Sequence, residues 1–477
     1  MIHHQELRSR YRRRRRRRVI LVAVLLLILY FVIGTCAPFV YLRPTGTGSG
    51  ALTRYLSDSE GSERVTLVES NVQALELRLK LIAEADEEIL LTTYEFKAGA
   101  SSDALAAAML DAADRGVRVR ILVDGLCGLT NMEGRDFFTA LATHPSIEIR
   151  LYNRFNPLLP WKMSGRLHDK MFVIDSEAYI VGGRNTWDRF LGDYGVEDES
   201  IDRELLVVST EADATHSIHS LRAYFDRLWE SDPVDGFRLY GAEYDDPDMV
   251  SERERIRRNA YTDFAVALSG GFSEWALANT VATDRVTLIT GEIGIYGKSP
   301  EVWSEMKMLM LSARERVVIQ SPYFVCSKYM YRDLAEVASG ASLTLVTNSV
   351  LNTDNKFTPA DYLYHQDDLL ATGASIMEYT GEKSSHAKTV LIDDSLVLIG
   401  SFNVDMRSAY MATELMVAVD SEALAQMVSE SFDALLDESI AVGEGTTVDV
   451  FVDEMSLWRK VWHYVFGVIL HPFRFEL

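Results

Sequence analysis

Short apolar runs and helix-like stretches alternate along the first half of the chain. Residues 65–68, 89–96 and 117–123 are apolar runs of strand length. Between them, apolar residues at helical spacing over 75–83 and an alanine-rich stretch at 104–113 indicate helices. Apolar runs without polar alternation are typical of strands that are buried on both faces. This order therefore predicts an α/β fold with a largely covered sheet.

The same order of elements returns in the second half. The recurring landmarks are Arg-Val-Thr-Leu at 64–67 and 285–288, the strand tyrosines Tyr94 and Tyr323, and the histidines His168 and His386. Chance could produce one such echo, but three in the same order predict a duplicated domain. We place its halves at residues 64–230 and 284–440, with residues 231–283 as a linker or surface excursion between them.

The N-terminus carries the pattern of a membrane anchor. Residues 19–42 are uncharged and long enough to cross the ~30 Å hydrocarbon core of a bilayer as a helix. Residues 1–18 include seven consecutive arginines and are expected to stay in the cytoplasm, which places the rest of the chain on the far side. Cleavage as a signal peptide is the alternative. Lipidation of Cys36 is weaker, because Thr35 is larger than the residue that usually precedes a lipidated cysteine.

Two flanking segments complete the predicted organisation. Residues 43–63 are rich in Gly, Ser and Thr and are expected to form a flexible linker. Residues 441–477 contain Trp458, Val461 and Trp462 at helical spacing beside basic residues, which is typical of an amphipathic tail in the lipid headgroup region. A helix packed on the domain fits this pattern equally well.

Charge and cysteine content argue against other classes of protein. The formal net charge is −22 although the N-terminus is basic, so the body is strongly acidic. Because nucleic acids are bound largely through Lys and Arg, such a body makes a poor general binder of DNA or RNA. The three cysteines form no CxxC pair, so the sequence indicates neither a disulfide framework nor a zinc cluster.

The strongest pattern is a pair of motifs, one in each half. In both, a lysine follows a histidine by two residues, an aspartate by seven and an asparagine by seventeen. The members are His168, Lys170, Asp175 and Asn185 in the first half, and His386, Lys388, Asp393 and Asn403 in the second. On a strand, residues i and i+2 project from one face, so each histidine and its lysine are expected to face the same cavity. Glycines before each asparagine let the backbone return beside them.

These residue types suit phosphoryl-group transfer. Two lysines and two asparagines around one point would bind the oxygens of a phosphate, so no metal or other cofactor is required. One neutral imidazole would attack phosphorus while the other, protonated, donates to the leaving alkoxide. We predict Tyr94 and Tyr323 as further substrate-binding residues, with core packing as the alternative.

Each imidazole also needs a carboxylate that fixes its tautomer. The sequences around Glu204 and Glu414 match between the halves, so these two glutamates are predicted to orient the histidines. The first half has extra residues between Asn185 and Glu204, which leaves Asp202 as the alternative to Glu204.

The paired motifs resemble the HKD signature of the phospholipase D superfamily, over residues 65–437. Within that superfamily they are most similar to the bacterial cardiolipin synthase branch. The reasons are the basic membrane segment, the Gly-Gly-Arg-Asn form that ends at Asn185, and Glu378-Tyr379 before the second motif. Thr413 departs from the pattern, because asparagine is expected there, and this puts a secondary hydrogen bond in doubt.

The resemblance implies two α-β-α sandwich halves that share one active site. It implies His168 as the nucleophile and His386 as the general acid, an assignment that symmetry makes reversible. By the same resemblance, Asp175 and Asp393 have structural roles.

The implied function is a phosphatidyltransferase that makes cardiolipin by a phosphohistidine ping-pong mechanism. Phosphatidylglycerol is the expected acceptor, and phosphatidylethanolamine is a further candidate substrate. The implied location is the bacterial inner membrane, crossed once, with the catalytic domain on the periplasmic side. The alternatives are a hydrolytic phospholipase D with the same machinery and, less compatible with the acidic body, a nucleic-acid phosphodiesterase.

Overall fold

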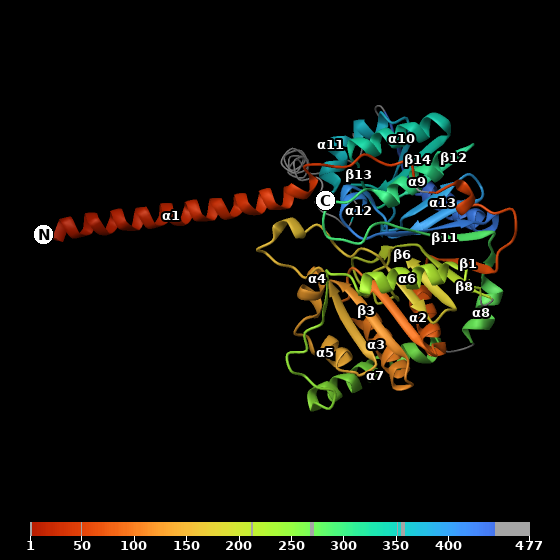
Figure 1. Cartoon of the computed structure of the whole chain (residues 1–477), viewed down its shortest axis with the longest axis horizontal. Coiled ribbons are helices and arrows are strands. Elements are labelled where there is room, and N and C mark those ends of the chain that lie inside the picture. Colours follow the sequence, from red (N-terminus) through yellow and green to blue (C-terminus); the bar gives the residue numbers. More distant parts are fainter. Residues whose placement is uncertain are drawn as a thin grey trace.

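A computed structural model describes residues 2–48, 50–210, 213–267, 271–350, 352–353 and 358–443. It contains a long N-terminal helix, α1 (Ile2–Cys36), and a body of two α/β layers stacked on each other (Figure 1). The predicted C-terminal tail, 441–477, lies outside the described residues from position 444 onward.

The first half is built on a mixed sheet in the order β10-β1-β8-β6-β5-β2-β3-β4-β9. Its strands are β1 Glu63–Val68, β2 Glu88–Thr93, β3 Arg118–Asp124, β4 Ile147–Tyr152, β5 Met171–Ile174, β6 Ala178–Gly182, β8 Glu204–Ser209, β9 Val234–Gly236 and β10 Val281–Ala282. Strands β2, β3 and β4 run parallel, and the remaining neighbours pair antiparallel.

The second half repeats this topology in the order β11-β20-β18-β17-β12-β14-β15-β21. Its strands are β11 Arg285–Thr290, β12 Arg316–Gln320, β14 Ser342–Asn348, β15 Ser375–Tyr379, β17 Thr389–Ile392, β18 Leu396–Gly400, β20 Leu415–Asp420 and β21 Ser439–Val442. Each of these eight strands, in the order given, occupies the place of one strand of the first sheet from β1 to β9, so the predicted duplication and the α/β fold are confirmed.

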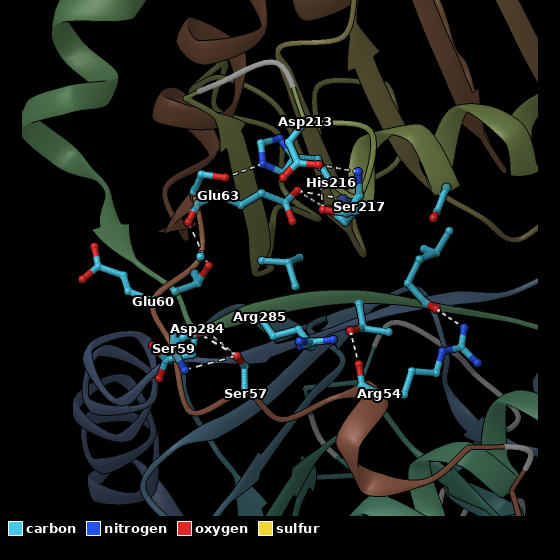
Figure 2. Close-up of a pocket in the computed structure, with 18 of the residues that line it drawn as sticks. Arg54, Ser57, Ser59, Glu60, Glu63, Asp213, His216, Ser217, Asp284 and Arg285 are labelled. Atoms are coloured by element: carbon cyan, nitrogen blue, oxygen red, sulfur yellow. Dashed lines mark hydrogen bonds between the residues drawn. The ribbon is translucent and has the colours of Figure 1, made fainter.

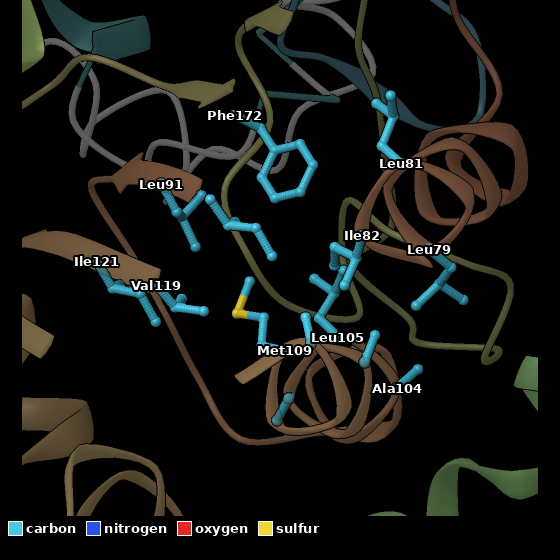
Figure 3. Close-up of a cluster of buried hydrophobic side chains, with 14 of the residues drawn as sticks. Leu79, Leu81, Ile82, Leu91, Ala104, Leu105, Met109, Val119, Ile121 and Phe172 are labelled. Atoms are coloured by element: carbon cyan, nitrogen blue, oxygen red, sulfur yellow. The ribbon is translucent and has the colours of Figure 1, made fainter. Parts of the chain in front are cut away.

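Helices cover both sheets. The first half carries α2 Asn71–Glu84, α3 Ala100–Asp114, α4 Gly125–Cys127, α5 Asp136–Ala142, α6 Ser217–Trp229, α7 Pro247–Ala267 and α8 Phe272–Asn279; the second carries α9 Glu301–Met310, α10 Lys328–Gly340, α11 Thr358–Leu370, α12 Met406–Tyr410 and α13 Glu422–Asp437. Figure 3 shows Ile82 of α2 and Met109 of α3 directed at Leu91 and Ile121 of the sheet. The apolar spacing that predicted these helices is therefore the face that they bury.

The two sheets face each other across a shared core. Val65, Leu90 and Val173 from the first half belong to the same buried cluster as Leu391 and Val397 from the second. Helix α6 of the first half contacts β11, and α13 of the second contacts β1. Because the halves share a core, they fold into one body, and sites on both sheets are held in fixed relation.

Residues 231–283 were predicted as a linker or surface excursion, and their described helices and strands pack on the first half instead of linking the halves as a free segment. Helix α7 packs along α3 and buries Ile256 and Ala260. Charged side chains of α7 also form ion pairs with α3, and Arg255 of α7 lies 3.1 Å from Asp103 of α3. A long run of charged residues concealed the narrow apolar face of this helix.

The N-terminal segments also differ in detail from their predicted boundaries. Helix α1 continues from the arginine block into the apolar run and ends at Cys36. Within the described residues, Tyr11–Phe39 is the one helix long and apolar enough to cross a membrane. The predicted flexible linker is anchored part-way, because Tyr55 is fully buried and its hydroxyl donates to Glu305 at 2.9 Å.

Candidate active site

The backbone of each half holds the histidine segment of the other half. His168 donates its N–H to Thr413 O at 3.2 Å, and Thr413 donates its N–H to Arg166 O at 2.9 Å. In the other half, the short strands β7 (Ser200–Ile201) and β16 (Ser384–Ser385) pair in parallel, and His386 donates its N–H to Ile201 O at 2.8 Å. The two motifs are thus locked together by main-chain hydrogen bonds before any side chain is considered.

This interlock places a carboxylate against each histidine, and each pair crosses the boundary between the halves. Nδ1 of His168 lies 2.7 Å from Oε1 of Glu414, the residue after Thr413. Nδ1 of His386 lies 2.8 Å from Oδ2 of Asp202, the residue after Ile201. A carboxylate on Nδ1 holds a proton there and leaves Nε2 for chemistry.

Both histidines line one cavity of about 250 Å³. Its walls combine residues of both halves: Tyr94, Glu95, Arg166, His168, Asn185, Arg189, Phe190, Tyr323, His386, Asn403, Asp405, Arg407, Ser408 and Ala412. The sequence prediction that one imidazole from each half would flank a common space agrees with this placement.

The two motif lysines lie beneath the histidines. Lys170 directly precedes β5 and donates from Nζ to His168 O at 2.8 Å. Lys388 directly precedes β17 and donates to His386 O. Both lysines are buried, with side chains that stay on the histidine side of their strands. The i, i+2 spacing therefore predicted correctly that each lysine lies on the same side of the chain as its histidine. Neither lysine lines the cavity wall itself.

The asparagines and tyrosines of the prediction all line the cavity. Asn403 donates from Nδ2 to the Tyr323 hydroxyl at 3.0 Å. Asn185 accepts from the Glu95 N–H at 3.2 Å. The ring of Tyr94 meets that of His168 edge-on, with centroids 5.7 Å apart. The aromatic side chains thus hold the imidazole and one amide in place.

Glu204 is a correction, because it orients neither histidine. Its carboxylate is buried in a bidentate pair with Arg78, at 2.6 and 2.9 Å, and lies 3.4 Å from Arg184. Asp202, the alternative, takes the place beside His386. Strand register gives the reason: Gly182 pairs with Glu204, whereas the equivalent Gly400 pairs with Met416. Glu414, two residues before Met416, is therefore the structural equivalent of Asp202.

Two parts of the chain, residues 79–229 and 306–436, match the family described as Cardiolipin synthase, PLD-like domain. Together they cover more than half of the 477 residues. The chain belongs to this family. The resemblance seen in the sequence is confirmed, and the chain is a member of a phospholipid-modifying enzyme family in the phospholipase D superfamily.

Known proteins that are similar to this chain include two bacterial relatives and one solved structure. Cardiolipin synthase C of Escherichia coli K12 is 29% identical over 76% of this chain and 83% of that protein. An uncharacterized protein of Helicobacter pylori strain 26695 is 26% identical over 88% of this chain and 92% of that protein. The crystal structure of a phosphatidylserine synthase from Haemophilus influenzae Rd KW20 aligns with a TM-score of 0.61 at 15% identity, over 87% of this chain and 95% of that one, and so shares the fold.

The electrostatics of the two histidine pairs in this family member are unequal. Burial, and then the charges of Lys170 and Lys388, hold the pKa of His168 well below 6.5. Burial raises the pKa of its partner Glu414 to about 7. Burial acts the same way on Asp202, but the hydrogen bond and charge of His386 prevail and lower its pKa to about 2. The Glu414 carboxyl therefore titrates near neutral pH beside an unprotonated imidazole, whereas the Asp202 carboxylate is ionised at neutral pH.

The sequence did not identify the groups that support Glu414 and His386. Ser401 and Ser408 both donate hydroxyl hydrogen bonds to the Glu414 carboxylate, the second at 2.6 Å. Phe190 packs against His386 with ring centroids 5.1 Å apart. Ser401 occupies the position in the second motif that Gly183 occupies in the first. The replacement of a glycine by a residue with a hydroxyl group could have identified Ser401 as a hydrogen-bond donor.

Asp175 and Asp393 carry out the same structural task in the two halves. Asp175 accepts the main-chain N–H groups of residues 86–88 at 2.6–2.9 Å, and Asp393 accepts those of residues 314–316 at 2.9–3.0 Å. Both adopt a φ of +49°, a left-handed conformation that Asp tolerates better than most residues. Each aspartate thus joins a hairpin turn to the start of the neighbouring strand.

We expect Asp175→Ala to lower the free energy of unfolding by about 2–3 kcal/mol, because buried N–H groups lose a charged acceptor. Asp175→Asn, which tolerates the same φ, should lose less. Chemical denaturation measures the stability, and kcat per folded molecule is measured alongside it. A fall in kcat without loss of stability would contradict a structural role.

At the equivalent Asp393, burial acts to raise the pKa, but the three N–H groups lower it below 3.8. Its stabilisation should therefore be complete above pH 3.8 and lost as the pH falls through that lowered pKa.

Proposed function

We propose that the protein is a cardiolipin synthase, which transfers a phosphatidyl group between two phosphatidylglycerol molecules through a covalent phosphatidyl-histidine. The observation that carries the proposal is the single cavity flanked by His168 on Glu414 and by His386 on Asp202. A displacement that uses an enzyme nucleophile needs one neutral and one protonated group on opposite sides of phosphorus, and this cavity supplies both candidates.

The unequal pKa values support the direction of attack. With a pKa well below 6.5 and Nδ1 donating to Glu414, His168 presents an unprotonated Nε2, which suits a nucleophile. The ionised Asp202 stabilises the protonated form of His386, which suits a general acid. Symmetry left these roles interchangeable in the sequence, and the electrostatic environment favours His168 as the nucleophile.

The reaction then has two balanced steps. Nε2 of His168 attacks phosphorus, the bond to the glycerol headgroup breaks, and His386 gives its proton to the departing oxygen. The hydroxyl of a second phosphatidylglycerol next gives its proton to His386 and attacks phosphorus, which breaks the bond to His168. We assign the phosphate oxygens to Lys170, Lys388, Asn185 and Asn403. Burial lowers the pKa of Lys170 to about 7, and a bound phosphate anion would raise it again.

The anchor supports a location for this chemistry. An apolar helix and cardiolipin synthase relatives indicate association with a membrane. We propose a single crossing of the bacterial inner membrane by α1, with the arginine-rich end in the cytoplasm and the body on the periplasmic side.

The test uses the full chain in mixed micelles with labelled phosphatidylglycerol as sole lipid. We expect cardiolipin and free glycerol in equal amounts, because each transfer releases one headgroup. Phosphatidic acid without cardiolipin would identify water as the acceptor and replace the synthase with a hydrolytic phospholipase D. Adding phosphatidylethanolamine tests the second candidate donor, with free ethanolamine as the readout.

A further inference from the structure

A second cavity, of about 920 Å³, lies beside the membrane anchor. It is bounded by the loop of residues 153–162 and the loop of residues 292–298, with the end of α6 and residues 231–238 between them. It shares no lining residue with the catalytic cavity among the described parts of the chain. It is therefore a separate compartment.

The loop of residues 153–162 packs against α1 inside its apolar span. The Tyr30 hydroxyl donates to Leu158 O at 2.6 Å, and the rings of Tyr30 and Trp161 meet edge-on at 6.4 Å. Gly34 touches Pro160 so closely that any side chain at this position would collide with it. Because Tyr30 and Gly34 belong to the segment that would cross a bilayer, the loop reaches the membrane surface when α1 is inserted.

Apolar side chains surround the anchor at this place. Val40 and Tyr41, which follow α1, are 82% and 80% exposed. Leu158 and Tyr296, on the two loops that bound the cavity, are 74% and 56% exposed. Gly297, next to Tyr296, approaches Pro38 of the anchor. Exposed apolar side chains grouped in this way are unfavourable in water and suit the boundary between lipid headgroups and acyl chains.

The cavity is basic although the protein is strongly acidic. Five lining residues are Lys or Arg and three are Asp or Glu, in a chain of net charge −22. Lys162, Arg227 and Arg238 form no ion pair with any residue that the structure describes. Lys298 is buried at the cavity wall and donates to Glu292 O at 2.7 Å. Uncompensated cations at the level of the headgroups attract anionic lipid.

A cavity of equal volume elsewhere provides the contrast. Figure 2 shows the cavity at the start of β1 and β11, where Arg54 and Arg285 lie across from Glu63 and Asp213. Its acidic residues, which include Asp284, outnumber its basic ones, and none of its lining residues comes from the 153–162 loop that contacts α1. Size alone thus does not distinguish the two cavities, whereas their charge does, and only the cavity beside the anchor is bounded by the 153–162 loop that contacts α1.

We propose that the cavity beside the anchor binds the headgroup of an anionic phospholipid, whose acyl chains remain in the bilayer along Leu158 and Tyr296. This site is distinct from the catalytic cavity and would hold anionic lipid next to it. The proposal rests on the insertion of α1 in a membrane and not on the transferase chemistry.

The test measures lipid retention by native mass spectrometry on the full chain carrying His168→Ala, so that no lipid is consumed. The probes are phosphatidylglycerol, phosphatidylcholine and inorganic phosphate, each titrated in zwitterionic micelles. We expect Lys162→Gln with Arg238→Gln to weaken the binding of one phosphatidylglycerol molecule roughly thirtyfold, because two cations near the headgroup are lost. Arg54→Gln with Arg285→Gln, in the cavity of Figure 2, is the matched control and should leave retention unchanged.

Three results would overturn the proposal: unchanged phosphatidylglycerol retention in the Lys162 and Arg238 variant, equal retention of phosphatidylcholine, or displacement of the lipid by inorganic phosphate at equal concentration. The third would mark a site for free phosphate. Because lipid bound in the catalytic cavity is common to the parent and both variants, the difference between them reports the second cavity alone. Failure of the transferase assay would leave this comparison intact.

Discussion

His168→Ala should abolish phosphatidyl transfer, with a fall in kcat on the order of 10⁵-fold, because the group that bonds to phosphorus is gone. His386→Ala should be nearly as inactive on phosphatidylglycerol, since the leaving glycerol oxygen then departs without a proton. The two variants differ in what they can still do. A donor with p-nitrophenol in place of glycerol needs no proton to leave, so it separates the roles.

With that donor, His386→Ala should release one equivalent of p-nitrophenol and retain the phosphatidyl group as an acid-labile adduct. His168→Ala should release none. Rapid-quench measurement of p-nitrophenol, with intact-protein mass spectrometry at neutral pH, checks both outcomes. His219→Ala, at an exposed histidine of α6, is the matched control and should behave as the parent does. A burst from His168→Ala with none from His386→Ala would reverse the assignment.

The chemistry of the site could be predicted from the sequence because it depends on short spacings. An i, i+2 relation on an extended segment is local, so the side of the chain that bears His168 and Lys170 follows from backbone geometry alone. The convergence of the two motifs was inferred from their repetition, and the structure places both histidines at one cavity.

What the sequence could not provide is the strand register inside each half, which decides which carboxylate reaches the histidine of the other half. Glu204 was chosen over Asp202 because Ala-Thr-Glu-Leu and Asp-Arg-Glu-Leu align best on glutamate, whereas the strands align on glycine, Gly182 with Gly400. That register depends on hydrogen bonds between β6 and β8 and between β18 and β20, which no single segment reveals. A slip of two residues preserves the face of the strand, so the apolar pattern gave no warning.

Helix α7 was missed for a related reason. Its apolar positions, Ile256 and Ala260, are few, and its charges looked like those of a solvated linker. The charges are instead matched by acidic residues of α3, such as Asp103 with Arg255, and this match exists only after folding. The choice between Glu204 and Asp202 and the packing of α7 therefore both depend on contacts between residues that are far apart in the sequence.

The corrected carboxylate leads to the second expected result. Asp202→Asn should lower kcat by on the order of 10³- to 10⁴-fold, because an amide no longer stabilises the protonated His386 and permits the wrong tautomer. The loss of stability should be small, since the asparagine keeps the shape of the aspartate. Steady-state kinetics with phosphatidylglycerol, alongside chemical denaturation, measure both quantities.

Glu204→Gln is the matched change two residues away and should show the opposite profile. Glu204 is fully buried against Arg78 and close to Arg184, so loss of its charge leaves two buried guanidinium groups uncompensated. Breaking such a pair costs about 3–5 kcal/mol of folding free energy. Because Glu204 contacts neither histidine, kcat per folded molecule should remain near that of the parent. If Glu204→Gln stays stable and loses turnover while Asp202→Asn keeps it, the sequence alignment would be right and the strand register wrong.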